Sequence, residues 1–174
     1  IFYVMLALRH YLRSQAWFEK INISVPNMLQ FLDLVALGTV ADLVSLDRNN
    51  RLLVSQGLQW IKAGKARPGI YALLKLAKRD VEYLVASDLS FSIAPRLNAA
   101  GRLADMSLGI ACLLETDRNR AHEFALQLSQ LNEERRSIEN TMKQEAFIIL
   151  EKLIEKEPLE KGIFIQIEDN GKGF

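Results

Sequence analysis

The sequence predicts a mainly α-helical chain, because two long segments have helical patterns and the best strand pattern covers only five residues. Residues 28–41 are apolar on nearly all sides and form too long a run for an ordinary strand, which favours a buried helix. Residues 116–157 carry one narrow apolar stripe over a stretch of about 40 residues, which indicates a long helix. Residues 163–167 alternate isoleucine with other residues and give the best strand pattern in the chain.

The individual helices are predicted from apolar periodicity and from residues that start and stop helices. Leu8 and Leu12 fall on one side of the first helix, whereas Arg9 and Arg13 fall on another. Helix caps are expected at residues 47–50 and 116–117, and helix stops at Gly64 and Pro158. In chain order, the predicted helices cover residues 1–15, 28–41, 51–63, 70–77, 107–114 and 116–157.

Composition limits the classes of protein to which the chain can belong. Its 22 basic and 21 acidic residues leave a formal charge of +1, so any phosphate binding must be local rather than driven by an overall basic excess. Cys112 is the only cysteine, which excludes an intrachain disulfide and a cysteine-based zinc cluster and favours a reduced, cytoplasmic setting. Arg9 and His10 interrupt the first apolar run too early for a membrane span of roughly 20 residues, so no membrane partner is expected. Because the chain begins with Ile1 rather than Met, we expect the natural N-terminus to lie upstream.

Asp42 is the first candidate for a chemical role, because it places a carboxylate directly after the apolar run. A carboxylate at the rim of a buried element can ligate Mg²⁺ or Mn²⁺. The alternative is an ordinary capping or surface aspartate, and the residues alone favour that alternative.

A stretch of small, polar and basic residues runs from Arg96 to Arg102, and we interpret it as a loop. Its two arginines flank small residues that include Gly101, so a phosphate can approach the backbone N–H groups, and Asn98 adds a neutral donor. The alternative is a structural loop whose arginines pair with carboxylates such as Asp105.

Other polar residues give weaker indications. Lys62, Lys65 and Arg67 form a second basic cluster, for which a solvated turn is the favoured interpretation. His10 and His122 have no second histidine or cysteine at ligand spacing and are expected to be structural or exposed. The sequence contains no Walker-A loop, dinucleotide-binding glycine motif, nucleophile elbow or zincin helix.

Several segments, in this order, resemble the RecJ exonucleases, a family of the DHH phosphoesterase superfamily. Residues 32–42 resemble the fourth catalytic motif of that family. Residues 67–70 and 95–103 match two later landmarks, and residues 131–136 match the helix that connects the two domains. The likeness covers nearly all of residues 1–167, and the segment 95–103 is the most specific part of it.

The resemblance implies a hydrolase that digests single-stranded DNA from the 5′ end, in DNA repair and recombination, with two Mn²⁺ or Mg²⁺ ions bound between two domains. It implies that Asp42 is a catalytic metal ligand. It also implies that Arg96, Asn98, Gly101 and Arg102 bind DNA phosphates in the same cleft. A monomeric parent protein is expected, and protein partners stay open.

The same resemblance divides the chain into three parts. Residues 1–115 correspond to the C-terminal part of an α/β DHH domain and residues 116–157 to a long interdomain helix. Residues 158–174 correspond to the start, including the first strand, of a second α/β domain of the DHHA1 type, although residues 168–174 depart from the family pattern.

The paired-aspartate and Asp-His-His motifs that supply the other metal ligands of the family do not occur in this sequence. The site is therefore expected to be incomplete here, and the chain by itself inactive. Two alternatives remain at this point. One is a RecJ-like scaffold that binds nucleic acid without catalysis, and the other is a DHH phosphoesterase that acts on small substrates.

Overall fold

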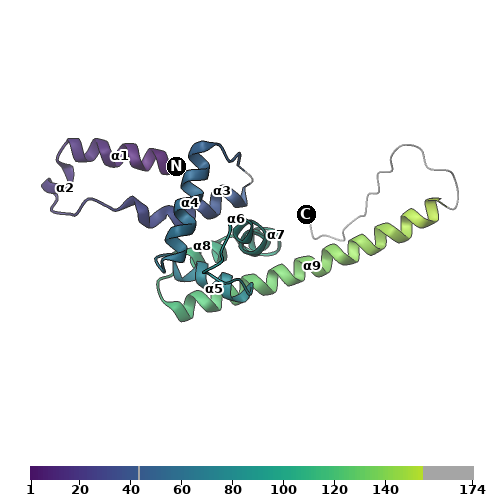
Figure 1. The fold of residues 1–174 in the computed structure, drawn as a ribbon. Helices are drawn as coiled ribbons and strands as arrows, with labels where there is room; N and C mark the ends of the chain where they lie inside the picture. The colour runs from purple at the N-terminus through teal and green to yellow at the C-terminus, as the bar shows by residue number, and fades with distance from the viewer. Residues whose placement is uncertain (43, 155–174) are drawn as a thin grey trace.

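The computed structural model describes residues 1–42 and 44–154 of the chain. Within these ranges every regular element is helical, which confirms the prediction of a mainly α-helical chain for the described part (Figure 1). The strand predicted at residues 163–167 and the domain start predicted at residues 158–174 lie outside the described residues.

The predicted helices are present, with small differences at their ends, over the residues that the structure describes; the predicted end of the last helix at residues 155–158 lies outside them. In chain order the elements are α1 (Phe2–Ser14), α2 (Trp17–Lys20), the 3-10 helix η1 (Met28–Phe31), α3 (Leu32–Ala41), α4 (Arg48–Lys62), α5 (Pro68–Leu76), α6 (Ala86–Asp88), the π-helix η2 (Leu89–Ile93), α7 (Ala94–Leu103), α8 (Ser107–Leu114) and α9 (Arg118–Ile154). The helix α4 begins earlier than predicted because Asp47 itself is the N-cap, and its carboxylate accepts the N–H of Asn50 at 2.8 Å.

The interpretation of the stretch from Arg96 to Arg102 as a loop is wrong, because these residues lie inside α7. Ala99 and Ala100 are fully buried, and α7 packs against α9. Small side chains serve two purposes in proteins, since they expose backbone to a ligand in a loop and allow close approach between two helices. In α7 the small side chains allow close approach between helices. The N–H groups in the middle of α7 are hydrogen-bonded within the helix and do not face a phosphate.

The helices α3 and α4 cross closely at Gly57. A methyl group at Gly57 would lie 2.3 Å from the carbonyl oxygen of Leu32 and 2.4 Å from Cβ of Ala36. Contacts this short cannot be accommodated without moving one helix, so the glycine fixes the position of α3 and of the residues at its C-terminal end.

We expect Gly57→Ala to lower the free energy of unfolding by about 1–3 kcal/mol, the usual cost of overpacking a well-packed core. The matched control is Gly38→Ala, because Gly38 also lies inside a helix but has no atom within 4 Å of the position that a methyl group would take. There the alanine should stabilise the helix by about 0.5–1 kcal/mol. Urea unfolding of both variants measures the difference, and equal effects would show that the helices do not cross in this way.

The long helix α9 belongs to the helical body only in its first part. Ala121, Ala125, Leu128 and Asn132 are fully buried, and α5, α7 and α8 pack against this part of the helix. Side chains at positions 133–151 are all at least partly exposed, and Figure 1 shows α9 projecting away from the other helices. Among the described residues, no helix is long and apolar enough to cross a membrane.

Candidate functional site

Asp42 lies at the C-terminal end of α3, where it is exposed to solvent. The apolar residues of α3 place it there, since Ala36, Leu37 and Val40 are buried in the core. The backbone N–H of Asp42 donates to the carbonyl oxygen of Gly38 at 3.2 Å. Its carboxylate has no hydrogen-bond or ion-pair partner among the described residues.

The position of Asp42 argues against a helix N-cap, and of the alternative only an ordinary surface aspartate stays open. An aspartate caps a helix by accepting N–H groups at the N-terminal end, whereas Asp42 stands at the C-terminal end of α3. The carbonyl groups of that end carry partial negative charge, so a carboxylate there is unfavourable by about 0.3–1 kcal/mol. A bound cation would make the electrostatic free energy at this position favourable, because both the carboxylate and the helix end would attract it.

Asp42 cannot form a metal site with its described neighbours alone. No group of three His, Cys, Asp or Glu side chains in residues 1–42 and 44–154 lies close enough together to hold a metal ion. The donor type and exposure of Asp42 fit a divalent cation, but the remaining ligands of such an ion would have to come from elsewhere.

Arg96 is partly buried between α7 and α9. Its Nε donates to Oγ of Ser129 on α9 at 3.1 Å, and its Nη1 donates to the carbonyl oxygen of Ser92. Burial lowers the pKa of Arg96, and the charge of Arg136 lowers it further. Part of the guanidinium therefore holds α7 against α9 and η2.

Asn98, Gly101 and Arg102 lie on a different side of α7 from Arg96. Their spacing of three and four residues places them on one exposed stripe, whereas Arg96 and Asn98 point about 200° apart around the helix. We call these three residues the α7 stripe. The structure thus separates the four residues that the sequence grouped together.

The pairing of these arginines with Asp105 is not observed. The Asp105 carboxylate accepts the N–H of Ser107 at 2.9 Å, and this hydrogen bond holds its pKa below the ordinary value. Neither Arg96 nor Arg102 forms an ion pair within the described part of the chain. The guanidinium of Arg102 is exposed and available to a ligand.

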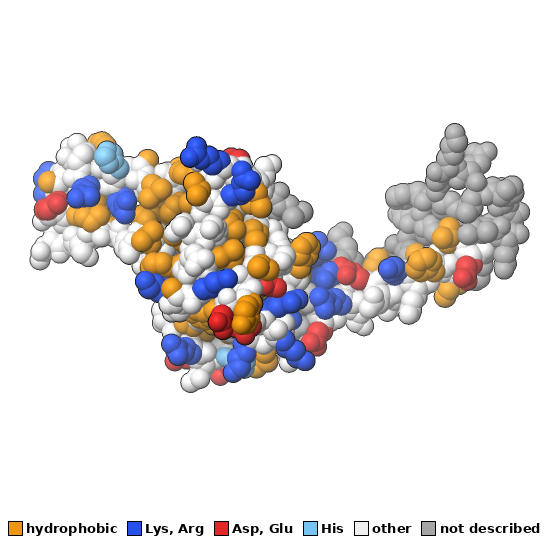
Figure 2. Space-filling view, in the orientation of Figure 1, with side chains coloured by type: hydrophobic (Ala, Val, Ile, Leu, Met, Phe, Trp, Pro, Cys, Tyr) orange, Lys and Arg blue, Asp and Glu red, His pale blue; other side chains and the backbone are white. Residues whose placement is uncertain are grey.

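Two further arginines near Arg96 escaped the sequence analysis. Arg79 donates to Oγ of Ser92 at 3.0 Å, and both Arg79 and Arg136 are close enough to lower the pKa of Arg96. Figure 2 shows Lys and Arg side chains gathering where α9 leaves the helical body. Arg136 follows two acidic residues and another arginine in the run 133–136, and such a mixed run is typical of an ordinary solvated helix face.

The second basic cluster is largely structural. Arg67 forms an ion pair with the carboxylate of Asp33, which is fully buried, and its backbone N–H also donates to Asp33 Oδ2 at 3.0 Å. The ammonium of Lys65 lies over the ring of Trp60, 5.1 Å from its centroid. The role of Asp33 could not be predicted from sequence, because a single carboxylate inside an apolar run gives no signal of its distant partner.

The chain is similar in sequence to proteins named single-stranded-DNA-specific exonuclease RecJ. It is 57% identical over 152 residues to the single-stranded-DNA-specific exonuclease RecJ of Escherichia coli. The aligned residues cover 87% of this chain and 26% of that protein. It is 37% identical over 122 residues to the protein of the same name from Bacillus subtilis, with 70% of this chain and 15% of that protein covered. The chain therefore spans about a quarter of the length of its Escherichia coli relative.

Solved structures give the same result. Thermus thermophilus RecJ in complex with Mg²⁺ matches 75% of this chain and 20% of its own length, with a TM-score of 0.62 and 32% identity. A structure of exonuclease RecJ bound to manganese matches with a TM-score of 0.62 and 34% identity, over 75% of this chain and 32% of its own length. A comparison with protein-family models finds no match. The relatives agree in both sequence and fold, and the chain belongs to the RecJ family.

Proposed function

We propose that this chain is the part of a single-stranded-DNA-specific exonuclease that supplies one metal ligand and one DNA-binding surface. The observation that carries the proposal is Asp42, an exposed carboxylate without a described partner at the end of a helix that disfavours its charge. The similarity of the chain to RecJ proteins supports a divalent cation at this position, because Thermus thermophilus RecJ has been solved both with Mg²⁺ and with Mn²⁺.

Each residue of the site has a distinct proposed role. Asp42 would hold a divalent ion, and such ions, when bound, supply a hydroxide nucleophile and stabilise charge on the phosphoryl group. Arg102 and Asn98 on the α7 stripe would donate to backbone phosphates of the DNA strand, and Gly101, exposed on the same stripe, would lie against the strand. Arg96 would fix α7 and add positive charge with the part of its guanidinium that is not used inside the fold.

The proposed domain organisation follows the family. Residues 1–115 would belong to a DHH phosphoesterase domain and residues 116–157 to the helix that connects it to a second domain, which begins at residues 158–174. The projection of α9 beyond the helical body supports the connecting role (Figure 1). We further propose that the parent protein is a monomer in the cytoplasm.

A chimera tests the activity. It consists of Escherichia coli RecJ in which the matching 152-residue segment is replaced by the corresponding segment of this chain. The chimera should degrade single-stranded DNA in the presence of Mn²⁺, and a label at either end of the strand shows the direction of digestion. EDTA should stop the reaction. A chimera that is folded and binds DNA but does not cut it would favour the alternative of a non-catalytic scaffold. That alternative stays open because the described residues contain no complete metal cluster.

The 174-residue chain alone is expected to show no nuclease activity, because Asp42 lacks the further ligands that two ions need. Incubation of the purified chain with labelled single-stranded DNA and Mn²⁺ checks this. Digestion that requires metal and disappears with EDTA would contradict the assignment of missing ligands to other parts of the protein.

In the chimera, Arg102→Ala should weaken binding of single-stranded DNA to a similar degree for different base compositions, because phosphate contacts carry no base information. The salt dependence of log K should fall by about 0.7 for the lost phosphate contact. Titration of labelled oligonucleotides at several salt concentrations, with Ca²⁺ in place of the active metal, measures both quantities.

Arg120→Ala is the matched control for Arg102→Ala. Arg120 is also exposed, but it lies near the start of α9 and pairs with Glu115 at 3.3 Å. Its loss should leave the salt dependence unchanged. Equal slopes for Arg102→Ala and the unmodified chimera would remove Arg102 from the DNA-binding surface.

A further inference from the structure

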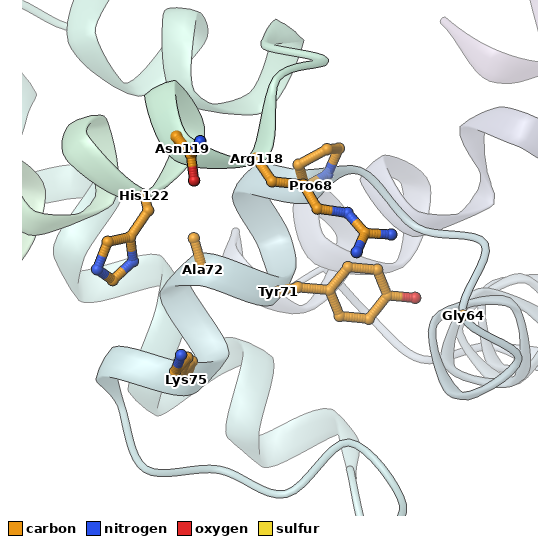
Figure 3. Close-up of a pocket in the computed structure, with 8 residues that line it drawn as sticks. All are labelled: Gly64, Pro68, Tyr71, Ala72, Lys75, Arg118, Asn119 and His122. Carbon is orange, nitrogen blue, oxygen red and sulfur yellow. The ribbon is translucent and has the colours of Figure 1, made fainter.

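A pocket of about 560 Å³ lies between α5 and the first turns of α9 (Figure 3). Its polar side chains do not converge on one point, because the guanidinium of Arg118 lies over the ring of Tyr71 and is directed away from Lys75 and His122 (Figure 3). This pocket therefore gives no indication of a ligand, whereas a smaller pocket at the C-terminal end of α3 does.

The smaller pocket has a volume of about 290 Å³ and lies between the end of α3 on one side and α6 and η2 on the other. Its lining is mostly apolar. Val40, Val44 and Leu46 come from α3 and the segment after it, and Ala86 and Phe91 come from α6 and η2. The pocket is thus built where two separate parts of the chain meet.

A hydrogen bond holds this pocket close to Asp42. The hydroxyl of Ser90 donates to the carbonyl oxygen of Val40 at 2.8 Å, and α3 packs against both η2 and α6 (Figure 1). Asp42 follows Val40 by two residues, and Phe91 directly follows Ser90. The proposed metal ligand and the aromatic ring therefore lie within two residues of the same contact between α3 and η2.

Phe91 extends the α7 stripe toward Asp42. Helical residues continue without a break through α6, η2 and α7, and both residues at the junction of η2 with α7 have right-handed helical dihedral angles. Phe91, Asn98 and Arg102 are all exposed and are separated by seven and four residues. Such spacings place them on one side of the continuous helix, to within a fraction of a turn.

The apolar residues around this pocket are unusually exposed as a group. Phe91 is 71% exposed, and Val44 and Leu46 are 43% and 48% exposed. A single exposed apolar side chain is common in proteins and needs no explanation, but here three of them line one pocket. A contiguous apolar surface of this kind indicates a binding site.

We propose that Phe91 is a stacking platform for one base of the single-stranded DNA whose phosphates contact Arg102 and the metal ion at Asp42. The inference rests on the proposed function and adds a residue to the same site. Proteins that bind single strands without sequence preference combine positive charge along the strand with aromatic rings on which bases stack. Arg102 supplies the charge and Phe91 the ring, both on one side of the helix.

The lining of the pocket favours a base over a phosphate as its occupant. Among the described residues, none that lines the pocket is charged. A phosphate would lose its hydration there without gaining a counter-ion, whereas an uncharged planar base loses much less. A volume of about 290 Å³ is near the lower limit of about 300 Å³ for small-molecule sites, which suits one base rather than a whole nucleotide.

The pocket offers few groups that could distinguish one base from another. Ser87 and Ser90 are its polar residues within the described part of the chain, and the hydroxyl of Ser90 already donates to Val40. Stacking tolerates all four bases, because every base has a π face. The contribution of Phe91 to binding should therefore be similar for strands of different composition.

Binding of two single-stranded oligonucleotides to the chimera tests the proposal, with Ca²⁺ in place of the active metal. One strand carries mixed bases, and the other is abasic and has the same phosphates. Phe91→Ala should weaken binding of the mixed strand at least about fivefold, the smallest factor expected for the loss of one stacked base. Binding of the abasic strand and the salt dependence of log K should stay unchanged, because no phosphate contact is lost.

Two matched variants make the test specific to an aromatic ring at this position. Phe91→Tyr keeps a ring and should retain the affinity for the mixed strand. Tyr83 is 74% exposed but does not line the pocket, so Tyr83→Ala should leave binding unchanged. The proposal would be overturned if Phe91→Ala weakened both strands equally, or weakened the mixed strand no more than Phe91→Tyr or Tyr83→Ala does.

The melting temperature separates a DNA base from another segment of the protein as the occupant of the pocket. If Phe91→Ala lowered the melting temperature of the chimera but retained the affinity for DNA, the ring would be covered by protein and the proposal would be wrong. If the unmodified chimera and Phe91→Ala bound the mixed strand equally, this inference alone would fail. If the unmodified chimera bound no single-stranded DNA, the proposed function would fail with it.

Discussion

Asp33→Ala is expected to lower the free energy of unfolding by about 3–5 kcal/mol, because it leaves the charge of Arg67 without its partner in the protein interior. The Asp33 side chain is fully buried, and that of Arg67 is 20% exposed. The same carboxylate also accepts the N–H of Leu34 at 2.8 Å. Residual exposure of Arg67 places the expected cost toward the lower end of this range. Urea unfolding of the chain, followed by circular dichroism, measures it.

The matched control for the loss of Asp33 is Glu139→Ala. Glu139 also pairs with an arginine, Arg135, but its side chain is 47% exposed on the surface of α9. Such a pair on a helix surface contributes about 0.3–0.5 kcal/mol. If Asp33→Ala cost no more than Glu139→Ala, the buried ion pair would not be what holds α3 to the turn before α5.

Asp42→Ala in the chimera is expected to reduce turnover at least about 100-fold, since a misplaced nucleophile alone can cost that factor. The free energy of unfolding should stay the same or rise by about 0.3–1 kcal/mol, because a negative charge is removed from the C-terminal end of α3. Turnover and melting temperature of the variant and the unmodified chimera test both parts.

Asp47→Ala gives the contrast to Asp42→Ala. Asp47 is an exposed carboxylate close by in sequence, but it caps α4. Its loss should cost about 1 kcal/mol of stability while turnover is retained. Near-normal turnover of Asp42→Ala would make Asp42 an ordinary surface residue.

The sequence was sufficient to predict α3 and α9, because each has a long and consistent pattern of apolar residues. It was not sufficient for α7. Ala99, Ala100 and Gly101 suit both a loop that approaches a phosphate and a helix that approaches another helix. What decides between the two is the packing of α9, which lies far along the chain, as the hydrogen bond from Arg96 to Ser129 illustrates.

The candidate sites differ in the same way. Asp42 could be found from sequence because it ends an apolar run and falls in a family motif. The grouping of Arg79 and Arg136 around Arg96 could not, because the three residues lie in separate segments that only the fold brings together. His122 was expected to be structural or exposed, and in the structure it is partly exposed near the start of α9.

Binding of Mn²⁺ to the chimera tests the central claim, that Asp42 is a metal ligand, more directly than activity does. Electron paramagnetic resonance of free Mn²⁺ during a titration gives both the number of bound ions and their affinity. We expect about two bound ions for the unmodified chimera. For Asp42→Asn we expect the loss of one ion, or Mn²⁺ binding that is weakened at least about tenfold. The same number of ions bound with the same affinity by both proteins would contradict the claim.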